Sequence, residues 1–226
     1  MLSVDNLGRR EGRLQILDNV SFDWTRGLLA VIGGNGTGKT TLLRVVAGAT
    51  APSTGKVAWN GVPTARAVRR MGAIGYGPQE RNLDLAITLR EFLSLCADLR
   101  GLAERTAKVA AVAEELGLVK QLDERLANLS GGGRRKAMTA QALLGASELI
   151  VLDEPTSEVD YAASRRFWSV FQARGKSCAL VIATHDVELA LTSADAILLL
   201  QRGKPARLAP AASFAIDELS SAIGEG

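Results

Sequence analysis

The hydrophobic pattern of the chain alternates between short apolar runs, typical of strands, and stretches with apolar residues three or four apart, typical of helices. Residues 20–32 contain two apolar runs, VSFDW and LLAVI, and a pair of glycines follows them. Residues 39–47 continue with an amphipathic helical pattern that ends at Gly48. The sequence therefore predicts strands, a glycine loop and a helix in this order.

Two later segments, residues 148–153 and 177–184, are nearly continuous apolar runs. Strands of this kind occur in parallel sheets that are covered on both faces. Residues 161–173 between them have helical character, which fits the right-handed crossover of such sheets. Another apolar run at residues 194–200 predicts a further strand, and a turn at residues 202–204 and a short Ala-rich tail follow it.

Three helices are predicted in the middle of the chain. Thr88 and Glu91 have the spacing of a capping box at the start of the first helix. An apolar stripe follows at helical spacing, and we expect it to belong to the core: Phe92, Leu93, Cys96 and Leu99. The second helix should span residues 104–116, and the third should begin at Ser130, a good N-cap residue.

Residues 56–62 predict a hairpin, because the pair Asn60-Gly61 separates two short strand-like runs. This places an antiparallel patch near the N-terminus. We therefore expect an α/β fold with a mostly parallel sheet, an N-terminal antiparallel β patch and an inserted helical lobe. The chain should form a single domain over residues 1–226, with a core of residues 1–79 and 147–226 and a lobe of residues 80–146.

Composition limits the possible classes of partner. The 27 basic and 24 acidic residues nearly balance, so charge does not favour a nucleic-acid partner. The basic runs at residues 134–136 and 165–166 are expected to be solvated helix faces. Cys96 and Cys178 lie in apolar runs, which indicates buried thiols in a reducing cytoplasm. The chain shows neither a secretory leader pattern nor an apolar run long enough for a membrane helix, so any membrane role needs a partner.

Residues 33–40 read GGNGTGKT, which matches the P-loop pattern, and they lie between a predicted strand and a predicted helix. The glycines allow backbone N–H groups to surround phosphate oxygens, and the helix N-terminus adds a favourable dipole. A glycine-rich turn is the alternative, but a chance match to the whole pattern in such a chain is rare, on the order of one per cent. The expected nucleotide contacts of this segment are Gly33, Asn35, Gly36, Thr37, Gly38, Lys39, Thr40 and Thr41.

Asp153 and Glu154 follow the apolar run ELIVL. At the carboxyl end of a strand, Asp153 would hold a magnesium ion through water beside Thr40, and Glu154 would polarise a water molecule that attacks the γ-phosphate. By itself, an Asp-Glu pair after a strand is more often a solvated loop. The P-loop earlier in the chain favours the functional interpretation.

These motifs occur in a distinctive order. The P-loop is followed by Gln79 in YGPQE, by LSGGG at residues 129–133, by VLDEPTSEVD, and by His185 in ATHD. In this order the chain resembles the nucleotide-binding domain of ABC transporters over essentially its whole length. An LSGG segment shortly before LDEPT distinguishes this family from GTPases and nucleotide kinases. The resemblance implies ATP and Mg²⁺ as cofactors and ATP hydrolysis as the activity.

The resemblance also implies roles for individual residues. Gln79 would contact magnesium and water, His185 the γ-phosphate, and Asp160 would belong to the loop that communicates between two paired sites. Ser130, Gly131 and Gly132 would bind the ATP of a second copy. The expected catalytic residues are Glu154, His185 and Gln79. The expected metal ligands are Thr40, Gln79 and Asp153.

The chain departs from the family pattern at three places. Gly133 replaces a residue that commonly carries a side chain, and Glu158 replaces a small or apolar residue. No aromatic residue that would stack on adenine occurs near residues 10–13, so Arg10 or Arg13 would have to stack its guanidinium on the base. The preference for adenine over guanine is therefore open.

The implied function is that of an ATPase subunit at the inner face of the cell membrane, where it would work with integral membrane subunits and a second ATPase copy. The sequences of residues 90–102, 122–132 and 140–157 are most similar to exporter-type subunits, and no long extension follows Leu208. Two alternatives remain open. One is a soluble ABC ATPase that is not coupled to transport, and the other is an ATP-gated binding module that hydrolyses poorly.

Overall fold

The computed structural model describes residues 1–68, 73–79, 86–145 and 147–224. In this part of the chain a six-stranded sheet has the order β10-β9-β3-β8-β7-β6. Its strands are β3 (Gly27–Ile32), β6 (Ile74–Gly77), β7 (Leu149–Asp153), β8 (Ala179–Ala183), β9 (Ala196–Leu199) and β10 (Arg207–Pro210). Neighbouring strands are parallel except for the antiparallel pair β9 and β10. The predicted mostly parallel sheet is thus confirmed.

A second sheet is antiparallel and has the order β2-β1-β4-β5 within the described residues. Its strands are β1 (Leu2–Glu11), β2 (Leu14–Trp24), β4 (Thr54–Trp59) and β5 (Val62–Pro63). The predicted hairpin at Asn60-Gly61 is present, with φ values of 49° and 74° that suit a type I′ turn. The sequence pattern did not predict β1, whose pairing with β2 contains several register shifts.

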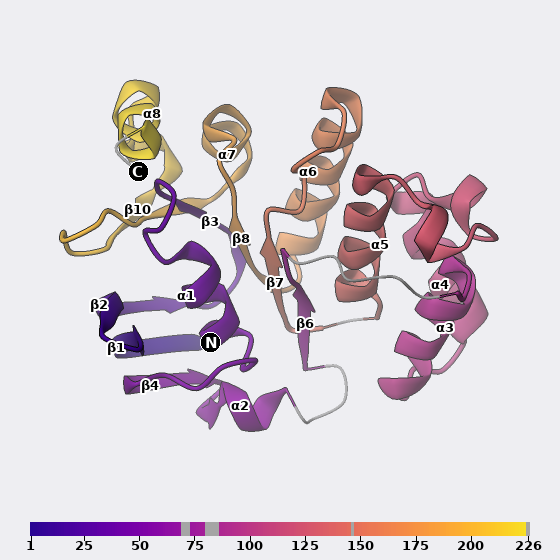
Figure 1. Cartoon of the computed structure of the whole chain (residues 1–226), viewed down its shortest axis with the longest axis horizontal. Coiled ribbons are helices and arrows are strands. Elements are labelled where there is room, and N and C mark those ends of the chain that lie inside the picture. The colour runs from indigo at the N-terminus through magenta and orange to yellow at the C-terminus, as the bar shows by residue number, and fades with distance from the viewer. Residues whose placement is uncertain (69–72, 80–85, 146, 225–226) are drawn as a thin grey trace.

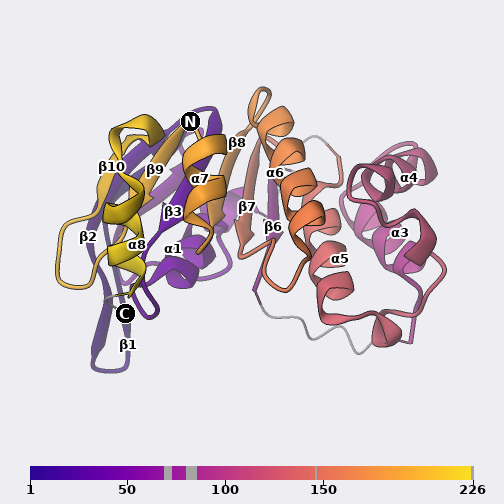
Figure 2. The ribbon, with the colours of Figure 1, turned by 90° about the horizontal axis from the view of Figure 1, so that it is seen from above.

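The helices are α1 (Lys39–Val46), α2 (Thr64–Ala67), α3 (Leu89–Leu99), α4 (Arg105–Glu115), α5 (Gly131–Leu143), α6 (Tyr161–Gly175), α7 (Val187–Ser193) and α8 (Ile216–Gly224). Figure 1 shows α1 and the antiparallel sheet on one side of the parallel sheet, and α5, α6 and α7 on the other. Figure 2 shows α3 and α4 at the end of the molecule farthest from β1 and β2.

Four strands of this sheet, β3, β7, β8 and β9, contribute buried residues to two apolar cores. In β3, Leu28, Ala30 and Ile32 belong to one core, in which β3 contacts α6 and α7 and which continues to the other helices from α3 to α8. Leu29 and Val31, on the opposite face, pack with α1 and the antiparallel sheet. Because both faces are covered, every residue of β3 is buried, which explains its continuous apolar sequence.

The first helix of the predicted lobe begins at the predicted capping box. The amide of Glu91 donates to Thr88 Oγ1 (3.2 Å), and the amide of Thr88 donates to Glu91 Oε2 (2.7 Å). The prediction of an apolar core stripe was wrong at Leu99, whose side chain is 71% exposed. The fully buried positions repeat every four residues instead, at Leu89, Leu93 and Ala97, so that Leu99 falls on the outer face.

Polar contacts join the helical lobe to the core. Arg174 of α6 forms an ion pair with Glu115 at the end of α4 (2.8 Å). Arg166, in a run expected to be solvated, donates to the backbone carbonyl of Glu115 (2.8 Å). Helix α5 itself packs against β6 and β7, so it belongs to the core as much as to the lobe. Glu80 and Ala146, the two ends of the predicted lobe, lie outside the described residues.

The Ala-rich tail forms a strand and a helix, which the sequence pattern did not predict. Arg207 of β10 pairs with Glu218 of α8 (2.6 Å) and lies 4.4 Å from the ring centre of Phe214. Cys96 is half-buried and Cys178 buried, and both carry free thiols, as expected. In the part of the chain that the structure describes, no helix is long and apolar enough to cross a bilayer.

Candidate active site

Four adjacent parallel strands bring the predicted site residues to one edge of the sheet. Strands β3, β8, β7 and β6 are neighbours in this order, and all four run in the same direction. Their carboxyl ends therefore meet at the same edge (Figure 1). The residues at these ends or directly after them are the P-loop, Thr184-His185, Asp153-Glu154 and Pro78-Gln79.

The P-loop needs glycine for reasons of space and backbone conformation. Gly38, which precedes α1, has a φ of 96°, and a Cβ there would lie 2.6 Å from Leu17 Cδ2. A Cβ on Gly33 would lie 2.3 Å from the carbonyl oxygen of Leu200. The loop thus passes close to β2 and β9 before it enters the N-terminus of α1, where backbone N–H groups and the helix dipole favour an anion.

Lys39 is buried at the first position of α1, and only 7% of it is exposed. Its Nζ donates to the carbonyl oxygens of Gly33 (2.7 Å) and Gly34 (2.9 Å), which holds the ammonium group over the loop. Burial lowers the pKa of Lys39, while the charges of Glu154 and Asp153 oppose this change. A positive charge therefore lies between the loop and the two carboxylates.

Three oxygen-bearing side chains meet beside Lys39. Thr40 Oγ1 lies 3.3 Å from Gln79 Oε1, to which it donates. Asp153 is 1% exposed, and among the described residues its Oδ2 has no hydrogen-bond partner. Burial raises the pKa of Asp153, and the neighbouring Thr40 side chain opposes the rise. Hydroxyl, amide and carboxylate oxygens suit a hard cation such as Mg²⁺, so the residues present fit the expected metal.

Glu154 is held by its backbone in an uncommon conformation, with a φ of 51° and its amide donating to the carbonyl of Ala183 (3.0 Å). Its carboxylate lies beside His185, with 3.1 Å between Glu154 Oε1 and His185 Nε2. Burial raises the pKa of Glu154 to about 7, against the opposing charge of Lys39. Burial and the charge of Lys39 lower the pKa of His185, which favours its neutral form.

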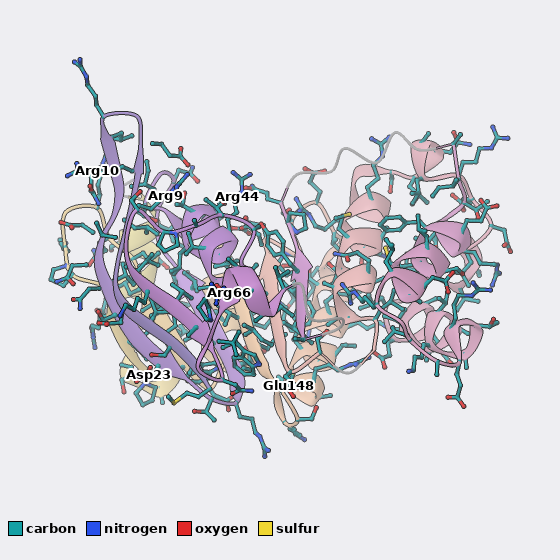
Figure 3. All side chains as sticks on the ribbon, turned by 90° about the horizontal axis from the view of Figure 1, so that it is seen from below. Arg9, Arg10, Asp23, Arg44, Arg66 and Glu148 are labelled. Carbon is teal, nitrogen blue, oxygen red and sulfur yellow. The ribbon has the colours of Figure 1, made fainter. Side chains whose placement is uncertain are left out.

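A cavity of ≈ 260 Å³ opens between these groups. Its lining brings together most of the predicted residues: Asn35, Gly36, Gly38, Lys39, Thr40, Thr41, Gln79, Glu154 and His185. Among the described residues, the lining also includes Ile16 of β2, and it does not include Arg10 or Arg13. No sequence motif indicates Ile16, because only the placement of β2 beside Gly38 brings it to the cavity. Arg10 instead donates to Gln15 on the hairpin arm that Figure 3 shows.

The residues of the signature segment, residues 129–133, form a separate group. Ser130 caps α5, as predicted, and its Oγ accepts from the amide of Gly133 (3.0 Å). Asp160 caps α6 by accepting from the amide of Ala163 (2.9 Å). Gly132 packs so closely on the loop before Asp160 that a Cβ would lie 2.7 Å from the carbonyl oxygen of Glu158. These residues do not line the cavity beside Lys39 in the same chain.

The expectation that residues 134–136 form a solvated helix face was wrong for Arg135. Its side chain is buried in α5, with 2% exposed, and its Nη1 donates to the carbonyl of Gln79 (2.9 Å). A run of three basic residues is typical of a solvated helix face, so the sequence pattern did not predict the burial of Arg135. The available sign was the helical phase, since Arg135 precedes the buried Thr139 by one turn.

The fold and this site define the class of the protein. A glycine loop at a helix N-terminus, a buried lysine and carboxylates at the ends of neighbouring parallel strands make up a P-loop nucleotide-binding domain. The model of the ABC transporter family matches residues 17–157. The chain therefore belongs to the ABC transporter family, as an ATP-binding ATPase domain.

Similar proteins include both importers and exporters. The zinc import ATP-binding protein ZnuC of Halorhodospira halophila is 37% identical over 221 residues, which cover 94% of this chain and 79% of that protein. The Nod factor export ATP-binding protein I of Mesorhizobium japonicum is 34% identical over 212 residues, which cover 90% of this chain and 62% of that protein. A solved ATP-binding subunit of an ABC transporter has a TM-score of 0.83 and 26% identity, with coverage of 93% and 90%.

Proposed function

We propose that this chain is the ATP-hydrolysing subunit of a transporter and that it drives a substrate, by export, through separate membrane subunits. The observation that carries the proposal is the convergence of Lys39, Glu154 and His185 on one cavity at the P-loop. In this proposal residues 1–79 and 147–226 form the nucleotide-binding core, and residues 80–146 form the lobe.

Hydrolysis would use these residues in distinct ways. The backbone of residues 33–38 would surround the phosphates, and Lys39 would reach the β- and γ-phosphates. Glu154 would orient a water molecule whose oxygen bonds to the γ-phosphorus while the bond to the bridging oxygen of ADP breaks. His185, beside Glu154, would contact the γ-phosphate and keep that carboxylate in place. The products are ADP and phosphate.

Thr40, Gln79 and Asp153 would hold Mg²⁺, which would neutralise charge on the phosphate oxygens. Burial of Asp153 supports this assignment, because a buried carboxylate oxygen without a partner is costly unless a cation or a donor meets it. Thr41 would add a contact to the α-phosphate, as its place on the cavity wall allows.

The signature segment would complete a second site on a partner ATPase copy. Ser130 and the amides of Gly131 and Gly132 lie at the N-terminus of α5, a position that favours an anion. Since they lie away from the cavity of their own chain, they would bind the ATP held by the other copy, and Asp160 would connect the paired sites. A solved bacterial cassette with the same fold is a dimer, at 22% identity and a TM-score of 0.82.

The direction of transport rests on the similarity to the Nod factor export proteins. Two zinc import proteins are 33% and 37% identical, so import is the competing direction and the two need a direct experimental comparison. The chain would lie at the inner face of the membrane, bound to its membrane subunits. Export predicts ATP-driven uptake of substrate into inside-out vesicles, whereas import predicts its release.

The test of the proposed activity is Mg²⁺-dependent ATP hydrolysis by the purified chain as a function of protein concentration. Specific activity should rise with concentration, because each site needs two copies. It should disappear in Lys39→Ala, which lacks the positive charge that contacts the phosphates, and in the presence of EDTA. Activity that survives in Lys39→Ala would refute the assignment of the P-loop.

A further inference from the structure

Arg135 occupies a position that none of the expected site residues explains. It lies in α5, five residues after the Ser130 that caps this helix, and only 2% of it is exposed. A buried guanidinium is costly unless its donors and its charge are matched by the surroundings. The groups that surround the Arg135 guanidinium therefore indicate its role.

The Nη1 atom of Arg135 faces backbone carbonyls from two segments of the candidate active site. It donates to Gln79 (2.9 Å) and lies 3.4 Å from the carbonyl oxygens of both Pro78 and Asp153. Gln79 and Asp153 are two of the three proposed magnesium ligands. One side chain thus joins the ends of β6 and β7 from beneath the site.

A second side chain of α5 strengthens this link. Gln141 donates to the backbone carbonyl of Tyr76 and accepts from Arg100, the residue that follows α3 (3.2 Å). Helix α5 therefore holds both Tyr76 and Gln79. Since Ser130 lies at the N-terminus of the same helix, a displacement of the signature segment would carry the Arg135 guanidinium with it.

The charge of Arg135 also faces the acidic groups of the site. Asp153 and Glu154 are both buried, and the positive charge of Arg135 interacts favourably with each of their carboxylates. The guanidinium thus compensates charge at the same place where it organises the backbone.

We propose that Arg135 is a positioning residue: it holds Gln79 against Asp153 and couples both to the helix that carries the signature segment. The inference deepens the proposed function and rests on the assignment of Gln79 and Asp153 to the Mg-ATP site. Arg135 need not touch the nucleotide. Its loss should loosen Gln79 while the P-loop stays intact.

The test compares Arg135→Met, which keeps an unbranched apolar stem without the donors or the charge, with Arg135→Lys, which keeps the charge and an ammonium donor. Arg165→Met is the matched control, because Arg165 is exposed on α6. Hydrogen exchange of the nucleotide-free chain is measured for residues 74–79 and for the P-loop, residues 33–41. On the same variants, turnover is measured with Mg-ATP, and the affinity for ATP is measured in EDTA.

Arg135→Met should speed exchange severalfold in residues 74–79 and leave the P-loop unchanged. Turnover should fall on the order of tenfold or more, while ATP affinity in EDTA changes less than about threefold. Arg135→Lys should recover a substantial part of both losses, and Arg165→Met should resemble the parent chain.

Two outcomes overturn the proposal. Exchange that rises equally across the whole chain in Arg135→Met would show a merely structural role, and unchanged exchange in residues 74–79 would show that Arg135 does not hold Gln79. A failure of the proposed function gives a different result. The parent chain would then show no hydrolysis that depends on Lys39, whereas the hydrogen-exchange comparison, which uses no nucleotide, would be unaffected.

Discussion

His185 Nε2 and Glu154 Oε1 lie 3.1 Å apart, although the two residues follow different strands, β8 and β7. Glu154 is buried, whereas the His185 side chain is 39% exposed at the mouth of the site. Hence the imidazole covers the outer side of the carboxylate. A histidine in this position keeps the carboxylate oriented and adds a polar group that can meet a phosphate oxygen.

His185→Ala should lower turnover on the order of a hundredfold, with a much smaller loss of ATP affinity. The reason is that the P-loop and Lys39 supply most of the phosphate contacts. Steady-state hydrolysis and binding of a fluorescent ATP analogue provide the two measurements. His185→Gln, which keeps a polar amide, should lose less turnover. A loss confined to affinity would contradict the role of His185 beside Glu154.

Glu154→Gln should bind ATP and fail to hydrolyse it, because the amide keeps the shape of the side chain but is a far weaker base. The paired copies should then accumulate in the closed state. Size-exclusion chromatography with Mg-ATP should show a dimer for Glu154→Gln and a monomer for Lys39→Ala. A Glu154→Gln chain that stays monomeric at saturating ATP would exclude the mechanism with two paired copies.

The same substitution should alter stability in a pH-dependent way. The pKa of Glu154 is raised from 4.5 to about 7 in the fold, so the folded state binds this proton more tightly than the unfolded state. The stability that protonated Glu154 contributes is fully present below about pH 4.5 and is lost as the pH rises through about 7. At pH 8 in EDTA, Glu154→Gln should exceed the parent chain in unfolding free energy, by at most about 3.5 kcal/mol, and the difference should vanish at a pH well below 4.5. Urea titrations at several pH values measure it, and a difference independent of pH would contradict the shift.

The capping box gives a prediction that does not involve the site. Thr88→Ala removes the side-chain oxygen that accepts from the amide of Glu91 (3.2 Å). The unfolding free energy should fall by about 1 kcal/mol, as for other N-cap substitutions. Thr106→Ala, at an exposed position inside α4, is the control and should change stability by less than about 0.5 kcal/mol. Equal effects of the two substitutions in urea denaturation would show that the cap contributes nothing.

Local patterns predicted the features that depend on local chemistry. The capping residue Ser130, the turn at Asn60-Gly61 and the P-loop before Lys39 each follow from residues adjacent in sequence. Each needs a particular side chain or an uncommon φ, so the sequence at these places is distinctive.

Features that depend on packing between distant segments were missed. Ile16 reaches the cavity only because the antiparallel sheet lies against the P-loop. Arg135 is buried because carbonyls from β6 and β7 surround it, and a run of basic residues carries no trace of those partners. Leu99 looked like a core residue because apolar spacing alone does not tell which face of α3 meets α5.

Gly132 provides the sharpest test of the signature segment within a single chain. A Cβ at this position would lie 2.7 Å from the carbonyl oxygen of Glu158, which belongs to the backbone and cannot rotate away. Gly132→Ala should therefore displace the N-terminus of α5 or the loop that leads to Asp160. The cost in unfolding free energy should be about 1–3 kcal/mol, as for other overpacked positions.

Gly133→Ala is the matched comparison, because a Cβ there would lie 3.3 Å from two side-chain atoms, Leu129 Cβ and Ser130 Oγ. Alanine is favoured over glycine inside a helix by roughly 0.5–1 kcal/mol, which offsets the tight contact. We expect Gly133→Ala to keep its stability and turnover, and Gly132→Ala to lose turnover on the order of tenfold or more. Urea denaturation and Mg-ATP hydrolysis measure both variants. If the two substitutions have the same effect, the contact between Gly132 and Glu158 does not position the signature segment.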